Sequence, residues 1–133
     1  MSTPRQILST GTKWERAFGY SRAVRVGVHV YVAGTTAVDE SGNIIGAGDP
    51  YAQAAAVLKK IEKSLDRVGA SMNDVVRTRI FVTDMAHSEP VGRAHGEFFG
   101  DIRPASTMVQ VVKLIDTRLL VEIEADAVMQ GEG

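Results

Sequence analysis

Three acidic side chains recur at every second position near the end of the chain: Glu122, Glu124 and Asp126. Side chains alternate across a β-strand, so these three carboxylates share one face. The other face carries the apolar residues Val121, Ile123, Ala125 and Ala127. Three carboxylates are too costly to bury together without partners, so their face is either solvated or lines a polar cleft.

A short turn with two hydroxyl groups, Ser106 and Thr107, precedes this strand and strengthens the case for a cleft. A nucleophilic role for either hydroxyl is disfavoured because no histidine stands at a diagnostic position. We therefore do not expect either hydroxyl to act as a nucleophile.

The three histidines form no pattern typical of a metal site. His95 and Glu97 stand two apart on a predicted helix and do not share a face, because helical neighbours are three or four residues apart. His29 and His87 lie far away in sequence, so no metal is expected. We expect His95 to lie at the surface or in an interface; the alternative is a proton carrier that reaches the cleft.

Composition excludes several classes of protein. With 133 residues, of which 44% are hydrophobic, the chain has the length and apolar content of one folded domain. The formal net charge is −1 and no basic stripe is present, which argues against a nucleic-acid partner. The absence of cysteine excludes disulfides, thiolate metal sites and a cysteine nucleophile. No glycine-rich phosphate-binding loop is present.

No signal-peptide or membrane-spanning pattern is predicted. The first residues, MSTPRQILSTGTKW, lack the apolar region of a signal peptide. No apolar run approaches the ~20 residues of a membrane-spanning helix. The sequence therefore predicts a soluble, cytoplasmic protein without a membrane partner.

Strand and helix patterns alternate along the chain. Valines at period two over residues 23–35 predict a strand or hairpin that breaks at Gly27. Asp49 and Pro50 form a helix start, and apolar residues at helical spacing continue to Val68. The remaining predicted elements are a short strand near 44–45, a strand over 75–84, a helix over 88–99, and strands over about 106–114 and 119–129.

This order predicts an α+β sandwich in which both helices cover one face of a mixed sheet. Apolar residues on both faces of the sheet leave one face without a cover. In so small a chain the simplest cover is a second copy, so we expect a homo-oligomer.

The pattern resembles the RidA/YjgF family, also called the endoribonuclease L-PSP family. The matching features, from about Thr12 to Val128, are Arg103-Pro104-Ala105-Ser106-Thr107 followed by Val121-Glu122-Ile123-Glu124-Ala125, Tyr20, residues 32–35, residues 69–71 leading into 74–78, and residues 80–84. The resemblance implies one RidA-like domain over residues 1–133, with an arm at 1–12 and a tail at 130–133. It also implies a chorismate-mutase-like α+β fold and a homotrimer with ligand clefts between subunits.

The resemblance also implies a chemistry and a set of site residues. Characterised deaminating members hydrolyse reactive enamines and imines, such as 2-aminoacrylate, to keto acids and ammonia without a cofactor. Glu122 matches the glutamate that orients water or a proton; without the resemblance, a solvated or paired carboxylate would be favoured. The substrate-binding residues expected are Tyr20, Gly34, Thr35, Ser106, Thr107 and Met108, and Trp14 either walls the pocket or packs in an interface.

One position departs from the deaminating members. They carry an arginine after Pro-Ala that holds the substrate carboxylate, whereas this chain has Ser106. Loss of such a contact costs about 2–5 kcal/mol of binding, so the chain resembles an arginine-lacking branch and a neutral substrate would fit better. Arg16, Arg22 and Arg103 are the candidates for a replacement cation.

Three functions therefore compete on sequence grounds. The first is a cofactor-free hydrolase or deaminase acting on small enamine, imine or related amino metabolites. The second is a trimer that binds a small molecule without turning it over. The third is a ribonuclease, against which the near-neutral charge speaks.

Overall fold

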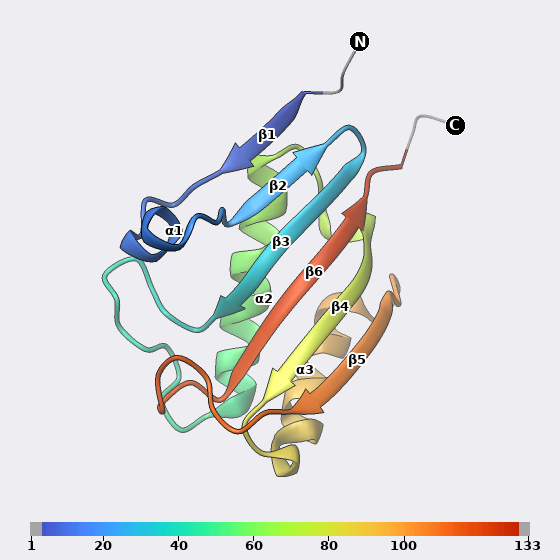
Figure 1. Ribbon diagram of the computed structural model, residues 1–133. Coiled ribbons are helices and arrows are strands. Elements are labelled where there is room, and N and C mark those ends of the chain that lie inside the picture. Colours follow the sequence, from blue (N-terminus) through green and yellow to red (C-terminus); the bar gives the residue numbers. More distant parts are fainter. Residues whose placement is uncertain (1–3, 131–133) are drawn as a thin grey trace.

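Six strands form one mixed sheet in the order β1-β2-β3-β6-β4-β5 (Figure 1). The computed structural model describes residues 4–130. The strands are β1 (Arg5–Leu8), β2 (Ala23–Val26), β3 (His29–Thr36), β4 (Val75–Val82), β5 (Ala105–Gln110) and β6 (Val121–Val128). The helices are α1 (Lys13–Phe18), α2 (Pro50–Arg67) and α3 (Ser88–Phe99), with 3-10 turns η1 (Met72–Asp74) and η2 (Met85–His87).

The two long helices, α2 and α3, lie side by side on one face of the sheet, as predicted (Figure 1). Helix α2 begins where the sequence predicts, because Asp49 accepts a hydrogen bond from the Ala52 amide at 3.0 Å and Pro50 occupies the first turn. Its buried stripe consists of Gln53, Ala54, Val57, Leu58, Ile61 and Leu65. No helix within residues 4–130 has both the length and the apolar character needed to cross a bilayer.

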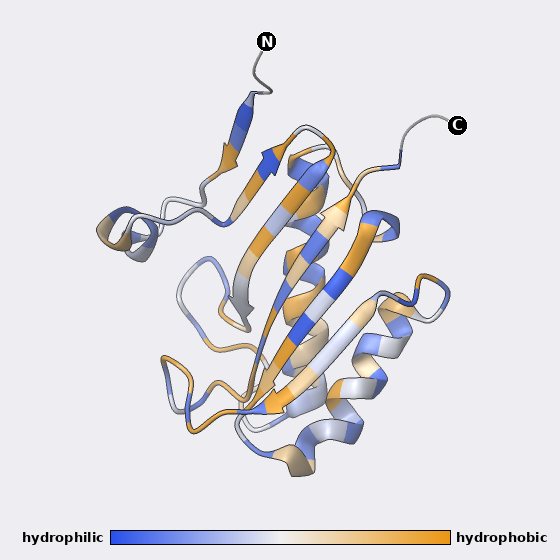
Figure 2. Cartoon of the chain, turned by 45° about the vertical axis from the view of Figure 1, so that its right-hand side comes forward, coloured by the Kyte–Doolittle hydropathy of each residue, from blue (hydrophilic) through white to orange (hydrophobic). Residues whose placement is uncertain are grey.

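Strand β6 lies in the interior of the sheet, antiparallel to both β3 and β4. Its burial alternates strictly, which confirms the period-two prediction. Figure 2, coloured by hydropathy, shows hydrophilic and hydrophobic bands along the strands of the sheet. The buried side chains are Val121, Ile123, Ala125 and Ala127, each at most 2% exposed. Glu122, Glu124 and Asp126 therefore share the face that the helices leave open.

The open face carries both charges and apolar side chains. Arg79 on β4 lies 3.3 Å from Glu124 and 3.2 Å from Asp126, so these two acids pair with a basic neighbour. Tyr31 is 50% exposed and Val109 is 41% exposed in the single chain. This face is the one that the sequence predicts a second copy to cover.

Strand β3 is interrupted by a bulge that bears on the site. Val32 pairs with Ala125, but the next pair joins Thr35 to Ile123. Residues 33 and 34 therefore stand opposite a single residue of β6, and the carbonyl of Gly34 is available to groups outside the ladder. Bulges of this kind re-aim side chains and occur often beside functional sites.

One strand and one helix, β1 and α1, were not predicted. Residues 5–8, expected as part of an arm, form the edge strand β1, in which only Leu8 is buried. An edge strand with one buried residue gives no alternating pattern to detect, and the six residues of α1 are too few to show helical periodicity. Residues 44–45 form only an isolated bridge between Ile44 and Val38, and β5 ends four residues before the predicted 114. Residues 1–3 and 131–133 of the expected arm and tail lie outside the described residues.

Candidate functional site

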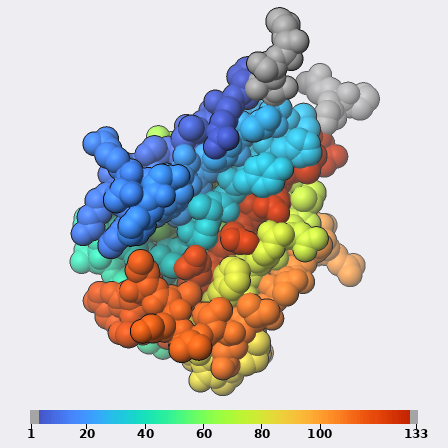
Figure 3. Space-filling view, in the orientation of Figure 1, coloured from blue at the N-terminus to red at the C-terminus, as the bar shows by residue number. Residues whose placement is uncertain are grey.

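A cavity of about 920 Å³ lies where β3 ends and β6 begins. Its wall comes from α1 and the residues after it, from the β3 bulge, from the polar edge of α2 and from the loop before β6. In Figure 3 the blue α1 segment and the orange loop that contains Ile115 lie on the same side of the molecule. The side chains that bear on chemistry here are Trp14, Phe18, Tyr20, Arg22, Lys60 and Glu122.

Glu122 lies at the start of β6, where it pairs with Thr36 on one side and Phe81 on the other. Its carboxylate is half-buried and lines the cavity. Burial raises the pKa of Glu122 above its ordinary value of 4.5, the charge of Glu124 adds to this, and the charge of Arg22 opposes it. Its position in the cavity and its raised pKa both suit the Glu122 carboxyl to general acid–base chemistry.

Gly34 lies directly against this carboxylate. A Cβ atom built on Gly34 would overlap the Glu122 Oε2 atom, so no larger residue fits without moving Glu122. The requirement for glycine thus comes from the close approach of a catalytic candidate, and not from a positive φ angle.

Arg22 reaches into the same corner from the segment before β2. Its Nη2 donates to the Gly34 carbonyl at 2.9 Å, and its guanidinium carbon lies 5.5 Å from the centre of the Tyr20 ring. Within residues 4–130, no carboxylate lies within ion-pair distance of Arg22, whereas the Arg79, Arg93 and Arg118 guanidinia each have at least one. Of the three candidate cations, only Arg22 lines the cavity; Arg16 and Arg103 do not.

The aromatic wall is positioned by the caps of α1. Thr12 accepts a hydrogen bond from the Glu15 amide, and Gly19, in the left-handed conformation, ends the helix. The amide of Tyr20 donates to the Glu15 carbonyl at 3.0 Å, which fixes the chain direction beyond the helix. Trp14 and Phe18 stack at 5.4 Å between ring centres and are 42% and 68% exposed.

Lys60 is a site residue that the sequence analysis missed. Its ammonium donates to the carbonyls of Thr36 and Val38 at 2.7 and 2.8 Å. Burial lowers the pKa of Lys60 below its ordinary value, and the nearby Arg22 charge lowers it further. In the sequence, Lys60 is marked only by its place beside the apolar stripe of α2, three residues after Val57. Because such lysines are common on solvated helix faces, this place does not identify a site residue.

The hydroxyl of Thr35 does not face the cavity. The side chain is 3% exposed and donates to the Ala33 carbonyl at 2.8 Å. Only the backbone of Thr35 is thus left for a ligand, as for Gly34.

The other predicted substrate-binding residues lie elsewhere in the chain. Ser106, Thr107 and Met108 are on β5, at the opposite edge of the sheet, and do not line the cavity of their own chain. The Ser106 hydroxyl accepts a hydrogen bond from Thr78 at 2.8 Å on the helical side of the sheet. Their part in a cleft therefore requires a neighbouring copy and stays a prediction.

His95 lies between α3 and the sheet rather than in the cavity. Its Nε2 is 2.8 Å from the Thr78 hydroxyl, and its ring packs 4.7 Å from that of Phe99. Burial lowers the pKa of His95, which favours the neutral ring. Among the described residues no cluster of three histidine, aspartate or glutamate side chains could hold a metal ion.

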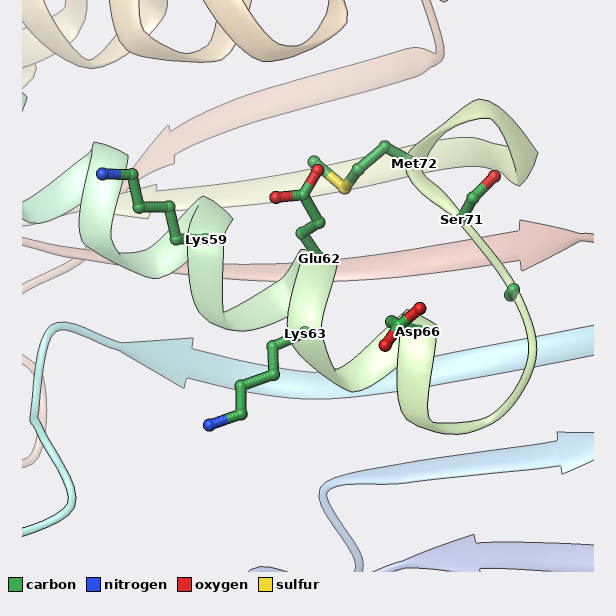
Figure 4. Close-up of a pocket in the computed structure, with 7 residues that line it drawn as sticks. Lys59, Glu62, Lys63, Asp66, Ser71 and Met72 are labelled. Carbon is green, nitrogen blue, oxygen red and sulfur yellow. The ribbon is translucent and has the colours of Figure 1, made fainter.

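A second hollow, of about 420 Å³, lies beside the C-terminal half of α2 (Figure 4). It is bordered by Lys59, Glu62, Lys63 and Asp66 and by the Ser71–Met72 turn. These charges of both signs project from the exposed side of the helix, without a convergent set of polar groups. We regard this hollow as a solvated surface.

Comparisons with known proteins identify the family of this chain. The Endoribonuclease L-PSP family model matches residues 11–129. An uncharacterised protein of Streptomyces coelicolor is 38% identical over 90% of this chain and 89% of its own length, and a RutC family protein of Pyrococcus abyssi is 36% identical over 81% and 84%. A crystal structure of a Mycobacterium tuberculosis member of the YjgF/YER057c/UK114 family shares 48% identity at a TM-score of 0.86, covering 95% of this chain and 100% of that one.

The raised pKa of Glu122 predicts an effect on stability. A carboxyl whose pKa is higher in the folded state contributes stability that is complete below the unfolded value of 4.5 and is lost as pH rises through the folded value. At neutral pH the charged form therefore costs free energy, which a neutral amide avoids. We expect Glu122→Gln to increase the urea-unfolding free energy at about pH 7 and to lose this advantage near pH 4. A variant that is less stable at pH 7 and unchanged at pH 4 would contradict the raised pKa.

Proposed function

Because the chain belongs to the Endoribonuclease L-PSP family, which includes the RutC and YjgF proteins, we propose that it is a cofactor-free hydrolase of small imines and enamines. The observation that carries this proposal is the half-buried Glu122, with its raised pKa, in a cavity of about 920 Å³. The ionised carboxylate accepts a proton from a water molecule as that water attacks the C=N carbon.

The reaction balances without a further reactant. Water adds across C=N to give a carbinolamine, and the proton held by Glu122 returns to the nitrogen. Collapse of the carbinolamine releases ammonia and leaves the carbonyl product. An enamine enters the same path after tautomerisation, in which its carbon gains a proton and its nitrogen loses one, to give the imine. Every step is a proton transfer, the addition of water or the elimination of ammonia, so one carboxylate in a partly desolvated cavity is sufficient.

The rest of the cavity supports this role. The Tyr20 hydroxyl supplies a polar contact, and the backbone amides at Gly34 and Thr35 offer further ones. In a homotrimer, Ser106, Thr107 and Met108 of a neighbouring copy would close the open side of each cleft. The exposed apolar side chains on the open sheet face support such an assembly.

A binding protein without turnover is the alternative, and the aromatic wall favours it as much as it favours an enzyme. A ribonuclease, which the family description names, receives no support from the charge of the chain, because a net charge of −1 gives little attraction for phosphate groups.

Imine hydrolysis separates the two leading candidates. Imino acids would be generated by an amino-acid oxidase in the presence of semicarbazide, which traps whatever imine survives. We expect the wild type to reduce the trapped product, and Glu122→Gln to lose about 10²–10⁴-fold in kcat/KM, since one general base contributes about that much. Activity should also fall with acid through a pKa above 4.5. Glu89→Gln, an exposed carboxylate on α3, is the matched control.

Two results would contradict the hydrolase. If the wild type does not reduce the amount of semicarbazide-trapped product from any imine, yet binds the corresponding keto acid, the protein is a binding module. If Glu122→Gln is as active as the control, the water is activated by another group.

Assembly is tested separately. Sedimentation equilibrium should give a mass about three times 14.3 kDa, because the open sheet face exposes apolar area that a single chain cannot cover. Val109→Glu should shift the assembly towards monomer, whereas Glu89→Lys on α3 should not. A monomeric wild type would remove the neighbouring residues from the site.

A further inference from the structure

The cavity holds a cation whose partner is not supplied by the described chain. The three other basic residues that line it are paired or exposed: Lys60 donates to two backbone carbonyls, Lys63 pairs with Glu40, and Arg67 is exposed near the end of α2. Arg22 differs because it is partly buried and donates only one hydrogen bond, from Nη2 to the Gly34 carbonyl. A guanidinium has five N–H groups in a fixed fork, so it keeps donors for a bidentate anion.

Arg22 also lies where an anion would serve the reaction. Its hydrogen bond ends on the carbonyl of Gly34, and the Glu122 carboxylate lies against the Cα of the same glycine. The cation and the acid–base group are therefore anchored on a single residue. A 2-imino acid has its carboxylate bonded directly to the C=N carbon. The cation that binds the carboxylate and the base that activates the water must therefore be neighbours, as Arg22 and Glu122 are beside Gly34.

The cavity is larger and more aromatic than a three-carbon substrate requires. Its volume of about 920 Å³ is near the upper end of the roughly 300–1,000 Å³ seen for sites that hold drug-sized ligands. Trp14 and Phe18 stack on each other and expose the remaining ring surface, with Leu8 and Ile115 adding apolar wall. Such a wall suits an apolar or aromatic side chain of the ligand.

We infer that Arg22 is the carboxylate-binding residue of this cavity and that its ligand is a 2-imino acid with a large apolar or aromatic side chain. The anion-binding part stands by itself; the imine part rests on the proposed function. The cation lost at Ser106 is thus replaced from within the same chain, and a carboxylated substrate fits better than the neutral one expected from the sequence.

The test begins with binding, so that it does not depend on turnover. Trp14 is the only tryptophan, so its fluorescence reports on the aromatic wall. The probes are 3-phenylpropionate and its amide, which differ only in charge, and propionate, which lacks the ring. The variants are Arg22→Gln, Arg22→Lys and, as a matched control, Arg16→Gln, an exposed arginine outside the cavity.

The wild type should bind 3-phenylpropionate more tightly than either the amide or propionate. Arg22→Gln should weaken 3-phenylpropionate by about 10–100-fold, the range for a charged hydrogen bond, and leave the amide nearly unchanged. Arg22→Lys should recover part of the affinity, and Arg16→Gln should behave as wild type. Equal affinities of the acid and the amide, or an equal loss of both in Arg22→Gln, would overturn the inference; thermal melts identify a variant that fails by unfolding.

Turnover then extends the test to the substrate class. Imines made by oxidation of phenylalanine and of alanine should differ, with the phenylalanine imine hydrolysed at higher kcat/KM. Arg22→Gln should raise KM more than it lowers kcat, because Arg22 binds substrate and does not transfer the proton. Hydrolysis that depends on Glu122 but not on Arg22 overturns this inference and leaves the proposed function standing. Binding that depends on Arg22 without any hydrolysis supports Arg22 as the carboxylate-binding residue and contradicts the proposed hydrolase.

Discussion

The pleat of β6 is the constraint on which the rest of the structure depends. Because β6 pairs with β3 on one side and β4 on the other, it cannot shift register without disrupting both ladders. Its small and branched residues face α2, and its carboxylates must then face away from the helices. A one-residue slip would bury three acids, so the hydrophobic core itself fixes where Glu122 points.

The bulge in β3 converts this position into a site. It brings Gly34 against the Glu122 carboxylate and leaves the Gly34 carbonyl to accept from Arg22. Burial and the Glu124 charge raise the pKa of Glu122, while the Arg22 charge opposes this rise, so the carboxylate is a stronger base than an exposed glutamate. Without the Arg22 charge the pKa of Glu122 would be higher still.

The fold could be predicted from sequence because it depends on periodic patterns. The alternation in β6, the valines of β2 and β3, and the Asp49-Pro50 start of α2 all lie in elements that the structure confirms. What could not be predicted depends on single contacts. Nothing in the sequence distinguishes Arg22 from Arg16 as the cavity cation, since the difference is a hydrogen bond to a bulge carbonyl. Lys60 and Phe18 were missed for the same reason, and Ser106 lies on β5, away from the cavity of its own chain.

The most direct measurement is the titration of the Glu122 carboxyl by ¹³C NMR in the wild type and in Arg22→Gln. We predict a pKa above 4.5 in the wild type, because the carboxyl is partly desolvated, and a still higher pKa in Arg22→Gln, because the opposing charge is gone. Arg16→Gln removes one positive charge outside the cavity and should match the wild type. The comparison therefore separates the effect of Arg22 in the cavity from the effect of the net charge. A Glu122 pKa at or below 4.5, or one that Arg22→Gln leaves unchanged, would contradict a site built on this coupled pair.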